Sequence, residues 1–424
     1  MLQKIRRINI GSRWIVIFCL VFAGEMNFSL PFHVARFFRP TLLNVFDLSN
    51  AALGDAIAIY GIAAMIAYFP GGAIADRFSA RKLITVSLIF TALGGIYFAQ
   101  IPGRFGLSVL FGYWGITTIF LFWAALIKAT KEWGGEFAQG RAFGILDGGR
   151  GLIAAGAATF AVFLLRRFLP DNPDFANVYQ RREALQAVIY FYSLMTLASA
   201  LLVWIFIPDS KRSSTNLTSN FLTGIGKILQ NRLVWLQAAI VVASYTGYKG
   251  LDFYSLYSVD FLGMNEVGAA QFMSNASYLR VFAAIIAGLL VDRFSATKVI
   301  GSTFTLLLIS YILLVFLSPI PGTVILIYGN LIFTFAAVYA LRGVYFALLE
   351  ETNIDKILTG TAVGLISVIG FTPDVFLNSV AGRILDASPN LAGYHNFFML
   401  LAGFAVAGLL ASLALGYYVK RLKA

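Results

Sequence analysis

Long apolar segments, separated by short charged ones, are the feature of this sequence that most limits its fold. LITVSLIFTALGGIYFAQI, residues 83–101, contains no charged residue. About 20 such residues in an α-helix span the roughly 30 Å hydrocarbon layer of a membrane. The chain of 424 residues is 59% hydrophobic and only 12% charged, whereas soluble domains average about 25% charged residues. We therefore expect an all-α polytopic membrane protein.

A hydropathy window of about 19 residues predicts twelve transmembrane helices. The longest polar stretch follows residue 207, so we expect two pseudo-symmetric six-helix bundles, at residues 1–207 and 232–424, joined by a cytoplasmic linker at 208–231. The expected spans are 14–35, 52–74, 83–101, 106–128, 141–165, 184–207, 233–257, 267–290, 299–318, 322–348, 359–382 and 394–419.

Lys and Arg are distributed unevenly between alternate loops. If both termini are cytoplasmic, the cytoplasmic segments hold 20 of the 32 Lys and Arg residues, and the opposite loops hold eight, Arg36 and Arg39 among them. Cytoplasmic loops are enriched in these residues. We therefore expect a multi-pass protein of a bacterial-type inner membrane with both termini cytoplasmic, and this topology also accounts for the net charge of +12.

Residues suited to catalysis, metal binding or ATP binding are scarce. The chain has one cysteine, Cys19, and two histidines, His33 and His395, so we expect neither a metal site nor a Ser/His/Asp site. The sequence contains no GxxxxGK[ST] motif, which argues against ATP as the energy source. No basic run is interleaved with aromatic residues as in nucleic-acid-binding proteins. We expect a monomer without enzyme activity or cofactor, whose partners are a small-molecule substrate, the lipid bilayer, and either protons or a counter-anion.

One charged phrase occurs twice, about half a chain apart. GGAIADRFSARK covers residues 71–82 and GLLVDRFSATK covers residues 288–298, while GRAFGI at 140–145 is echoed by GTAVGL at 360–365. Two echoes at nearly the same offset indicate a duplicated six-helix unit.

The repeated phrase resembles the signature G-x-L-A-D-R-x-G-R-K that the major facilitator superfamily carries between spans 2 and 3, with Ser79 and Ala80 as departures from it. The resemblance implies a transporter in which these residues form a conformational gate that stabilises one state. The alternative is that the basic residues only set the topology. The signature positions are Gly72, Asp76, Arg77 and Arg81 in the first copy, and Gly288, Asp292 and Arg293 in the second.

The segment SYTGYKGLDFYSLYS, residues 244–258, places a cation and an acid inside the seventh expected span. At 100° per residue, its charged residues and two tyrosines fall on one face of a helix. We expect this face to bind a polar substrate, although Lys249 and Asp252 could also neutralise each other as an i, i+3 pair. The candidate substrate-binding residues are Tyr245, Tyr248, Lys249, Asp252, Arg280 and Asn27.

Two further acids are candidates for proton coupling. A charged side chain at the centre of a span costs about 2.5–3.5 kcal/mol on insertion scales, so it is retained for a reason. We expect Glu25 in the first span and Asp374 in the eleventh to take up and release a proton during transport. For Glu25 the alternative is permanent pairing with Arg280 or Lys249.

The remaining intramembrane charges have either a structural or a coupling role. Asp147 and Arg150 are spaced i, i+3 in the fifth expected span, which favours a structural pair. Arg342 in the tenth span could be neutralised by Glu350 or by Asp374.

A narrower resemblance concerns four short segments, one of which is DRFSAR (76–81) in the repeated phrase. The other three are EMNFSLP (25–31), LSNAALGD (48–55) and YKGLDFYSLY (248–257). All four are similar to parts of the organophosphate:phosphate antiporter and organic anion branch. In glycerol-3-phosphate transporters two arginines in spans 1 and 7 bind the phosphate; here Glu25 stands for the first, and Gly247 for the second, with Lys249 two residues later.

Together, these observations predict a secondary active transporter that works by alternating access. We expect its substrate to be a small polar metabolite, either an organic anion or a zwitterion, moved across the inner membrane by proton coupling or by exchange. The alternatives are efflux of drugs or organic cations, and a non-transporting membrane sensor of a related ligand.

Overall fold

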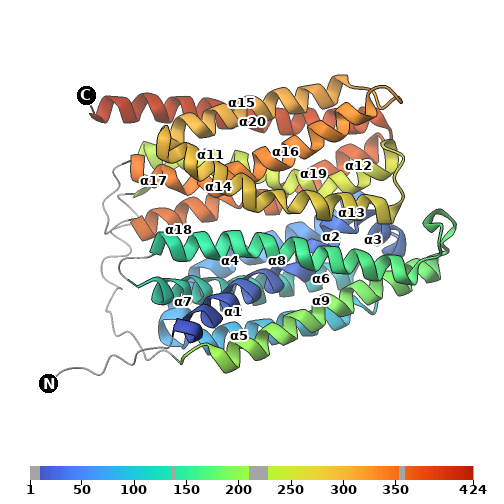
Figure 1. Cartoon of the computed structure of the whole chain (residues 1–424), viewed down its shortest axis with the longest axis horizontal. Helices are drawn as coiled ribbons and strands as arrows, with labels where there is room; N and C mark the ends of the chain where they lie inside the picture. The colour runs from blue at the N-terminus through green and yellow to red at the C-terminus, as the bar shows by residue number, and fades with distance from the viewer. Residues whose placement is uncertain (1–9, 136–138, 210–227, 353–358, 424) are drawn as a thin grey trace.

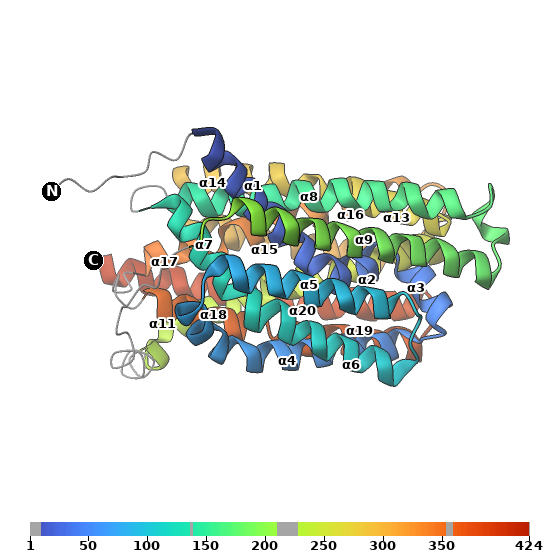
Figure 2. The ribbon, with the colours of Figure 1, turned by 90° about the horizontal axis from the view of Figure 1, so that it is seen from below.

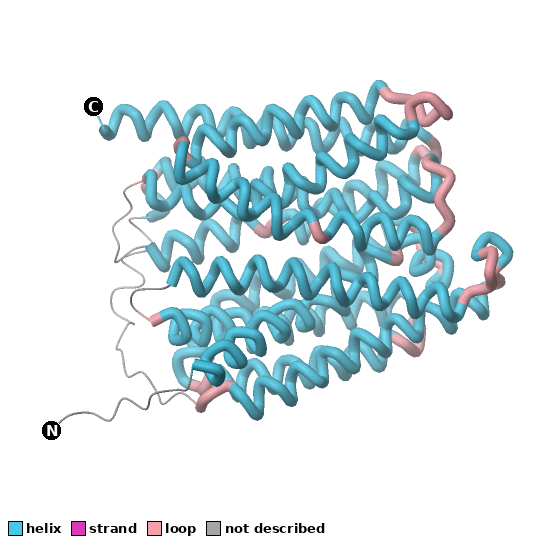
Figure 3. The backbone as a smooth tube through the Cα atoms, in the orientation of Figure 1, coloured by secondary structure: helices cyan, strands magenta, loops and turns pink. Residues whose placement is uncertain are grey.

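The computed structural model describes residues 10–135, 139–209, 228–352 and 359–423, and these form helices and loops without a strand (Figure 3). Within these ranges, eleven helices are long and apolar enough to cross a membrane. The all-α membrane fold expected from the sequence is confirmed. The seventh expected span is not among the eleven. It corresponds to α11 (Arg232–Gly250), η4 (Leu251–Phe253) and α12 (Tyr254–Phe261).

The helices of the first and second halves of the chain gather on opposite sides of the molecule (Figure 1). The first half comprises α1 (Ile10–Phe28), η1 (Ser29–His33), α2 (Val34–Phe37), α3 (Arg39–Phe46), α4 (Asn50–Arg77), α5 (Ala80–Phe98), α6 (Arg104–Ile116), η2 (Thr117–Trp123), α7 (Ala124–Gly134), α8 (Gln139–Phe168), η3 (Pro173–Phe175) and α9 (Val178–Phe206). Figure 2 looks onto this half, with α8 and α9 along one edge and α4 and α6 along the other.

The second half begins with α11, η4 and α12. It continues through α13 (Glu266–Ser277), α14 (Leu279–Arg293), α15 (Ala296–Phe316), α16 (Val324–Val344), η5 (Tyr345–Ala347), α17 (Leu348–Glu351), α18 (Thr359–Gly370), α19 (Pro373–Ala387) and α20 (Leu391–Lys423). The division of the chain at 208–231 stays a prediction, because residues 210–227 of that linker lie outside the described residues.

Apolar side chains cover the outside of the bundle. Ile66, Leu194 and Leu410 are 60% exposed or more, which suits contact with lipid rather than with water. Since lipid gives the helices no hydrophobic reason to associate, their contacts depend on close packing and on polar groups in the interior.

The two halves pack closely at one end of the bundle. α1 begins and α20 ends at the same end, which we call the terminal end; the opposite end is the distal end (Figure 1). Near the distal end α4 of the first half lies against α19 of the second. A Cβ atom added to Gly61 would lie 2.7 Å from backbone atoms of Asp374 and Val375, so only glycine allows these backbones to approach.

Polar contacts reinforce the same closure. A carboxylate of α19, Asp386, accepts hydrogen bonds from the N–H groups of Asn50 (3.0 Å) and Ala51 (2.8 Å) at the start of α4. A negative charge is favourable at a helix N-terminus. The guanidinium of Arg383 also contacts Asp55 of α4 at 2.7 Å. The distal end is therefore closed in this conformation.

We predict that Gly61→Val opens the distal end, because the larger side chain cannot fit between α4 and α19. The measurement is the distance between spin labels at Phe105 and Phe316, two highly exposed positions at the distal end of the first and second halves. The distance distribution should shift to longer values in the variant. Gly156→Val is the control, since no atom lies within 4 Å of a Cβ added there; an unchanged distance in Gly61→Val would contradict the prediction.

Candidate functional site

Several helices are interrupted where they cross the middle of the bundle. Such interruptions are characteristic of transporter sites, because they place side chains and free backbone groups near the membrane midplane. They comprise π-helical turns at η1 and η2, a 3₁₀ turn at η4, a break at Tyr278 between α13 and α14, and a break at Phe371 and Thr372 before Pro373.

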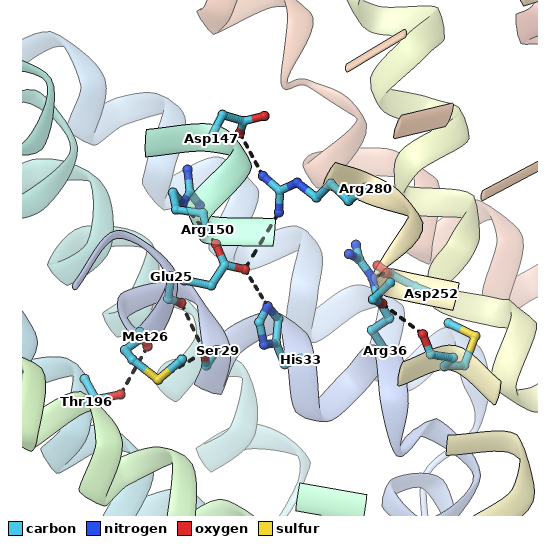
Figure 4. A network of polar contacts seen from close by, with 12 residues as sticks. Glu25, Met26, Ser29, His33, Arg36, Asp147, Arg150, Thr196, Asp252 and Arg280 are labelled. Carbon is cyan, nitrogen blue, oxygen red and sulfur yellow. Dashed lines mark hydrogen bonds and ion pairs between the residues drawn. The ribbon is translucent and has the colours of Figure 1, made fainter. Parts of the chain in front are cut away.

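The first of these interruptions has a local cause. Pro31, within η1, has no backbone N–H to donate, so the regular hydrogen-bond pattern of the helix cannot continue through it. Side chains bond to nearby carbonyl groups: Ser29 donates to the carbonyl of Glu25 at 3.0 Å, and Thr196 of α9 donates to that of Met26 at 3.1 Å (Figure 4). The helix is thereby held against α9 next to the charged residues.

Glu25 is the centre of a buried ion-pair cluster (Figure 4). Its Oε2 lies 2.9 Å from Nε of Arg150 on α8, and its Oε1 lies 3.0 Å from Nε2 of His33 on η1. Only 2% of Glu25 is exposed. A carboxylate removed from water to this extent requires close partners, and these three residues bring α1, η1 and α8 together.

Arg280, at the start of α14, connects this cluster to the second half. Its Nη2 lies 2.7 Å from Oδ1 of Asp147, and its Nη1 lies 3.9 Å from Oε1 of Glu25. The expected pair of Asp147 with Arg150 is not among the ion pairs of the described residues, since each side chain has a different partner. Of the two alternatives for Glu25, the contact is with Arg280 and not with Lys249.

A second chain of ion pairs joins the first span to α11 and α19. Nε of Arg36 lies 2.5 Å from Oδ1 of Asp252, whose Oδ2 is 3.4 Å from Nζ of Lys249. The same Nζ is 3.0 Å from Oδ1 of Asp374, and Asp374 accepts a hydrogen bond from the hydroxyl of Tyr245 at 3.0 Å. The i, i+3 pair of Lys249 and Asp252 is therefore present, but Lys249 shares its charge with a second acid.

Arg342 of α16 is a cavity-lining cation with no acid partner among the described side chains. The described side chains place no carboxylate within 4.0 Å of its guanidinium, and its Nη1 is buried without a hydrogen-bond partner among them. Instead, its Cζ lies 4.0 Å from the ring centre of Tyr248, and Cζ of Arg36 lies 4.2 Å from the same centre. Asp374 does not neutralise Arg342, and the side chain of Glu350 lies outside the described part of the structure.

The charges at the centre are therefore not balanced in the part of the chain that the structure describes. Among the described side chains that line the two cavities or pair with residues that do, every carboxylate has a cationic partner and one cation, Arg342, is left over. The cations are Arg36, Arg150, Lys249, Arg280 and Arg342, and the acids are Glu25, Asp147, Asp252 and Asp374. Arg39 lines neither cavity, and it donates hydrogen bonds to the side chains of Asn50 and Asn378.

A cavity lies between the two halves at this point. About 770 Å³ of space here is not filled by protein atoms, and this volume includes space open to the surroundings. Four cations (Arg36, Arg150, Lys249 and Arg342) and two acids (Glu25 and Asp374) line its wall, together with eight aromatic side chains. These aromatic residues are Phe28, Phe32, Tyr60, Tyr68, Trp123, Tyr245, Tyr248 and Phe371.

Of the six residues predicted to bind substrate, three line this cavity and three do not. Tyr245, Tyr248 and Lys249 line this cavity, as do the proton-coupling candidates Glu25 and Asp374. The other three lie elsewhere: Asp252 pairs with two cations beside the cavity, and Arg280 lines a second, smaller one. Asn27 lines neither cavity, because its Oδ1 accepts hydrogen bonds from Ser87 and Thr91 of α5 at 3.3 and 3.1 Å.

Two residues of the site were overlooked in the sequence. The placement of Arg36 in an external loop is wrong, because its side chain is 4% exposed and paired with Asp252; Arg39, assigned to the same loop, is fully buried. His33 was considered only as a catalytic or metal-binding residue. Arg36 follows Glu25 by eleven positions, which is about three helical turns, so the two residues fall on the same face of a helix. This shared face could have identified Arg36 as a residue of the site.

Within the described residues, the expected gate residues at the terminal end make few contacts in this conformation. No atom lies within 4 Å of a Cβ added to Gly72 or to Gly288. Arg81 pairs with Asp209 of its own half at 3.1 Å, and the remaining gate residues, Asp76, Arg77, Asp292 and Arg293, are exposed. Their gating role stays a prediction.

The sequence matches known proteins over most of its length. A family model described as Major Facilitator Superfamily matches residues 13–376. The chain is 30% identical over 410 residues to the inner membrane protein YqcE of Escherichia coli (strain K12), covering 95% of this chain and 93% of that protein. It is 29% identical over 424 residues to the inner membrane protein YihN of the same organism, with coverages of 97% and 96%.

Solved transporter structures share the fold at low sequence identity. A bacterial homolog of the human lysosomal transporter Spinster, inward-facing and unoccupied, has a TM-score of 0.73 at 14% identity and covers 97% of this chain and 98% of its own. The D-xylose-proton symporter has a TM-score of 0.73 at 16% identity, with coverages of 96% and 97%. The nucleoside transporter NupG has a TM-score of 0.70 at 13% identity, with coverages of 96% and 99%.

We predict that Glu25→Gln destabilises the protein strongly, because Arg150 would remain buried without its acid. Loss of one partner of a buried ion pair costs about 3–5 kcal/mol. The measurement is the melting temperature in detergent, followed by tryptophan fluorescence. Asp55→Asn is the matched control: it removes the exposed pair with Arg383 and should change the melting temperature little. Equal melting temperatures for Glu25→Gln and the parent protein would contradict the prediction.

Proposed function

Since the chain belongs to the Major Facilitator Superfamily and is a secondary transporter rather than an enzyme, we propose that it exchanges small organic anions across the inner membrane. The observation that carries this proposal is the position of Arg342. Its guanidinium lines the cavity between the two halves and has no carboxylate partner among the described side chains.

The charge balance favours an anion over the other substrate classes. An anionic group beside Arg342 would neutralise the one excess cation, with Lys249 close enough to share in binding. An organic cation would meet an excess of positive charge. The cationic end of a zwitterion would have to displace Arg150 or Lys249 from Glu25 or Asp374, because each of these acids is already paired.

The aromatic wall of the cavity favours an anion that also carries an apolar or ring-shaped part. Rings such as Phe32, Tyr60 and Trp123 offer flat apolar faces, and the binding of small molecules typically combines such faces with a few polar anchors. The single excess charge among the described cavity-lining side chains supports a monoanion. The narrower resemblance to organophosphate transporters stays a prediction.

The same excess charge favours exchange over proton coupling. During alternating access the site passes through a state closed to water on both sides, and an unpaired guanidinium there would lose its hydration without compensation. Reorientation of the empty protein is therefore unfavourable, whereas reorientation with a bound anion is not. Glu25 is held by Arg150 and His33 in this conformation, which supports a structural role more than a proton-carrying one.

The observed closure of the distal end supports an assignment of the conformation. If both termini are cytoplasmic, as we propose, the distal end faces the exterior and the conformation is inward-facing. The gate around Asp76 and Arg77 would then engage only in the opposite conformation, which agrees with its exposed state here. We propose that the protein works as a monomer, with one substrate cavity between its halves.

We predict that Arg342→Gln abolishes the stabilisation of the protein by anions. The measurement is a thermal-shift screen of purified protein with anionic, zwitterionic and cationic metabolites; a ligand at 100 times its Kd stabilises by about 2.7 kcal/mol. Anions should raise the melting temperature of the parent protein, less in Arg342→Lys and not in Arg342→Gln. Arg104→Gln, at the exposed start of α6, is the control and should behave like the parent.

Selective stabilisation by cations or by zwitterions would contradict the proposed substrate class. Stabilisation by the same anions in Arg342→Gln would remove Arg342 from the binding site.

A further inference from the structure

A second, smaller cavity adjoins the larger one and shares Tyr248 with it. It also shares Glu25, His33 and Arg36 with the larger cavity, and it is otherwise lined by residues of α2, α8, α13, α14 and α16, with Arg280 among them. Its size gives room for about one water-sized molecule.

Three polar atoms of the residues lining this cavity lack a hydrogen-bond partner among the described residues. They are Nδ1 of His33, Nη2 of Arg36 and Nε of Arg280. Each of these side chains is at least nine-tenths buried. Leaving a buried polar group without a hydrogen bond costs about 1–3 kcal/mol. Three such atoms in the residues around one small cavity therefore indicate that a bound ligand supplies their missing hydrogen bonds.

The charges around the small cavity indicate that this ligand is neutral. Arg36 is matched by Asp252 and Arg280 by Asp147, at 2.5 and 2.7 Å. Glu25, on the same wall, is matched by Arg150 at 2.9 Å. The excess cation of the site, Arg342, lines the larger cavity but not this one. A bound anion would therefore face carboxylates without a surplus of positive charge.

The hydrogen-bonding capacity of the three atoms fits water. A water oxygen accepts two hydrogen bonds, and Nη2 of Arg36 and Nε of Arg280 can each donate one. A water hydrogen can then be donated to Nδ1 of His33, provided that the proton of the imidazole is on Nε2. That proton position is the one that allows Nε2 to donate to Oε1 of Glu25 at 3.0 Å.

The second water hydrogen also has an acceptor. Ser277 lines the cavity, and its hydroxyl already donates to the carbonyl of Met273 at 2.8 Å. The hydroxyl of Tyr339 bonds to the same oxygen, and since a hydroxyl oxygen has two lone pairs, one remains for the water. Buried waters typically make about three hydrogen bonds, and this site offers that number and one more.

We propose that the small cavity is a binding site for a single water molecule that bridges the two halves, linking His33 and Arg36 of the first half to Arg280 of the second. The bound water holds His33 neutral, with its proton on Nε2. Because its partners come from both halves, this water is released or exchanged whenever the halves separate at this point. The proposal does not depend on which substrate is transported.

Magic-angle-spinning NMR of the ¹⁵N-histidine-labelled protein in lipid bilayers tests the proposal. His395→Gln leaves His33 as the single imidazole of the chain, provided that purification uses no histidine tag. We expect a neutral ring with a protonated Nε2, an unprotonated Nδ1 that accepts a hydrogen bond, and a cross-peak between Nδ1 and a water proton. A proton on Nδ1 would overturn the proposal, because three donors would then favour an anion; an unprotonated Nδ1 without a water contact would also overturn it.

A second variant tests the position of the water. Ala154 of α8 lines the small cavity, so Ala154→Val should fill it and remove the cross-peak between Nδ1 and water. Gly156→Ala on the same helix is the control, since a Cβ there meets no atom within 4 Å, and it should keep the cross-peak. A cross-peak that persists in folded Ala154→Val would place the water elsewhere and overturn the assignment; if this variant does not fold, the spectrum of the His395→Gln protein alone decides.

Discussion

The pairing of charges at the centre of a lipid-embedded bundle determines much of this structure. A charged side chain in the membrane interior is expensive unless a partner of opposite sign is close to it. Here the partners come from different helices and, for Arg280 with Asp147 and for Arg36 with Asp252, from different halves. The ion pairs therefore hold the halves together around a cavity, and Arg342 is left as the charge that a ligand can neutralise.

The overall fold could be predicted from the sequence, because lipid imposes a simple rule. In lipid, an apolar run of about 20 residues must form a helix, because a helix satisfies its backbone hydrogen bonds internally. Runs such as residues 83–101 can therefore be recognised as transmembrane helices from the sequence. The face of α11 that carries Tyr245, Tyr248 and Lys249 could be found in the same way. Its charged residues do not fit an outer, lipid-facing surface, and three of its members line the cavity.

The partners of these charges could not be predicted, because they are set by the packing of helices far apart in the sequence. Local spacing favoured a pair of Asp147 with Arg150, but packing gives each of them a different partner. The loop assignment of Arg36 failed for another reason: the first span continues as a helix through η1 and α2. Residues near the end of a hydropathy window can therefore still lie inside the bundle.

The closure of the distal end involves contacts both at that end and beside the charged centre. At the distal end a carboxylate of α19, Asp386, caps the start of α4, and next to the cavity Gly61 allows α4 and α19 to touch at Asp374. At the terminal end, the repeated phrase with Asp76 and Arg77 is exposed. In alternating access, each conformation is closed at one end of the protein and open at the other. The contacts at the distal end and the exposed residues at the terminal end agree with such a conformation. The ion pairs between the halves lie between these two regions.

In the exchange mechanism that we propose, the empty protein does not reorient while the charge of Arg342 is uncompensated. The most direct measurement is the efflux of a radiolabelled anion, chosen from those that stabilise the purified protein, from proteoliposomes with and without the same anion outside. We predict that efflux is fast only when the external anion is present. Equally fast efflux into anion-free medium would contradict obligatory exchange, and binding without efflux under either condition would contradict transport itself.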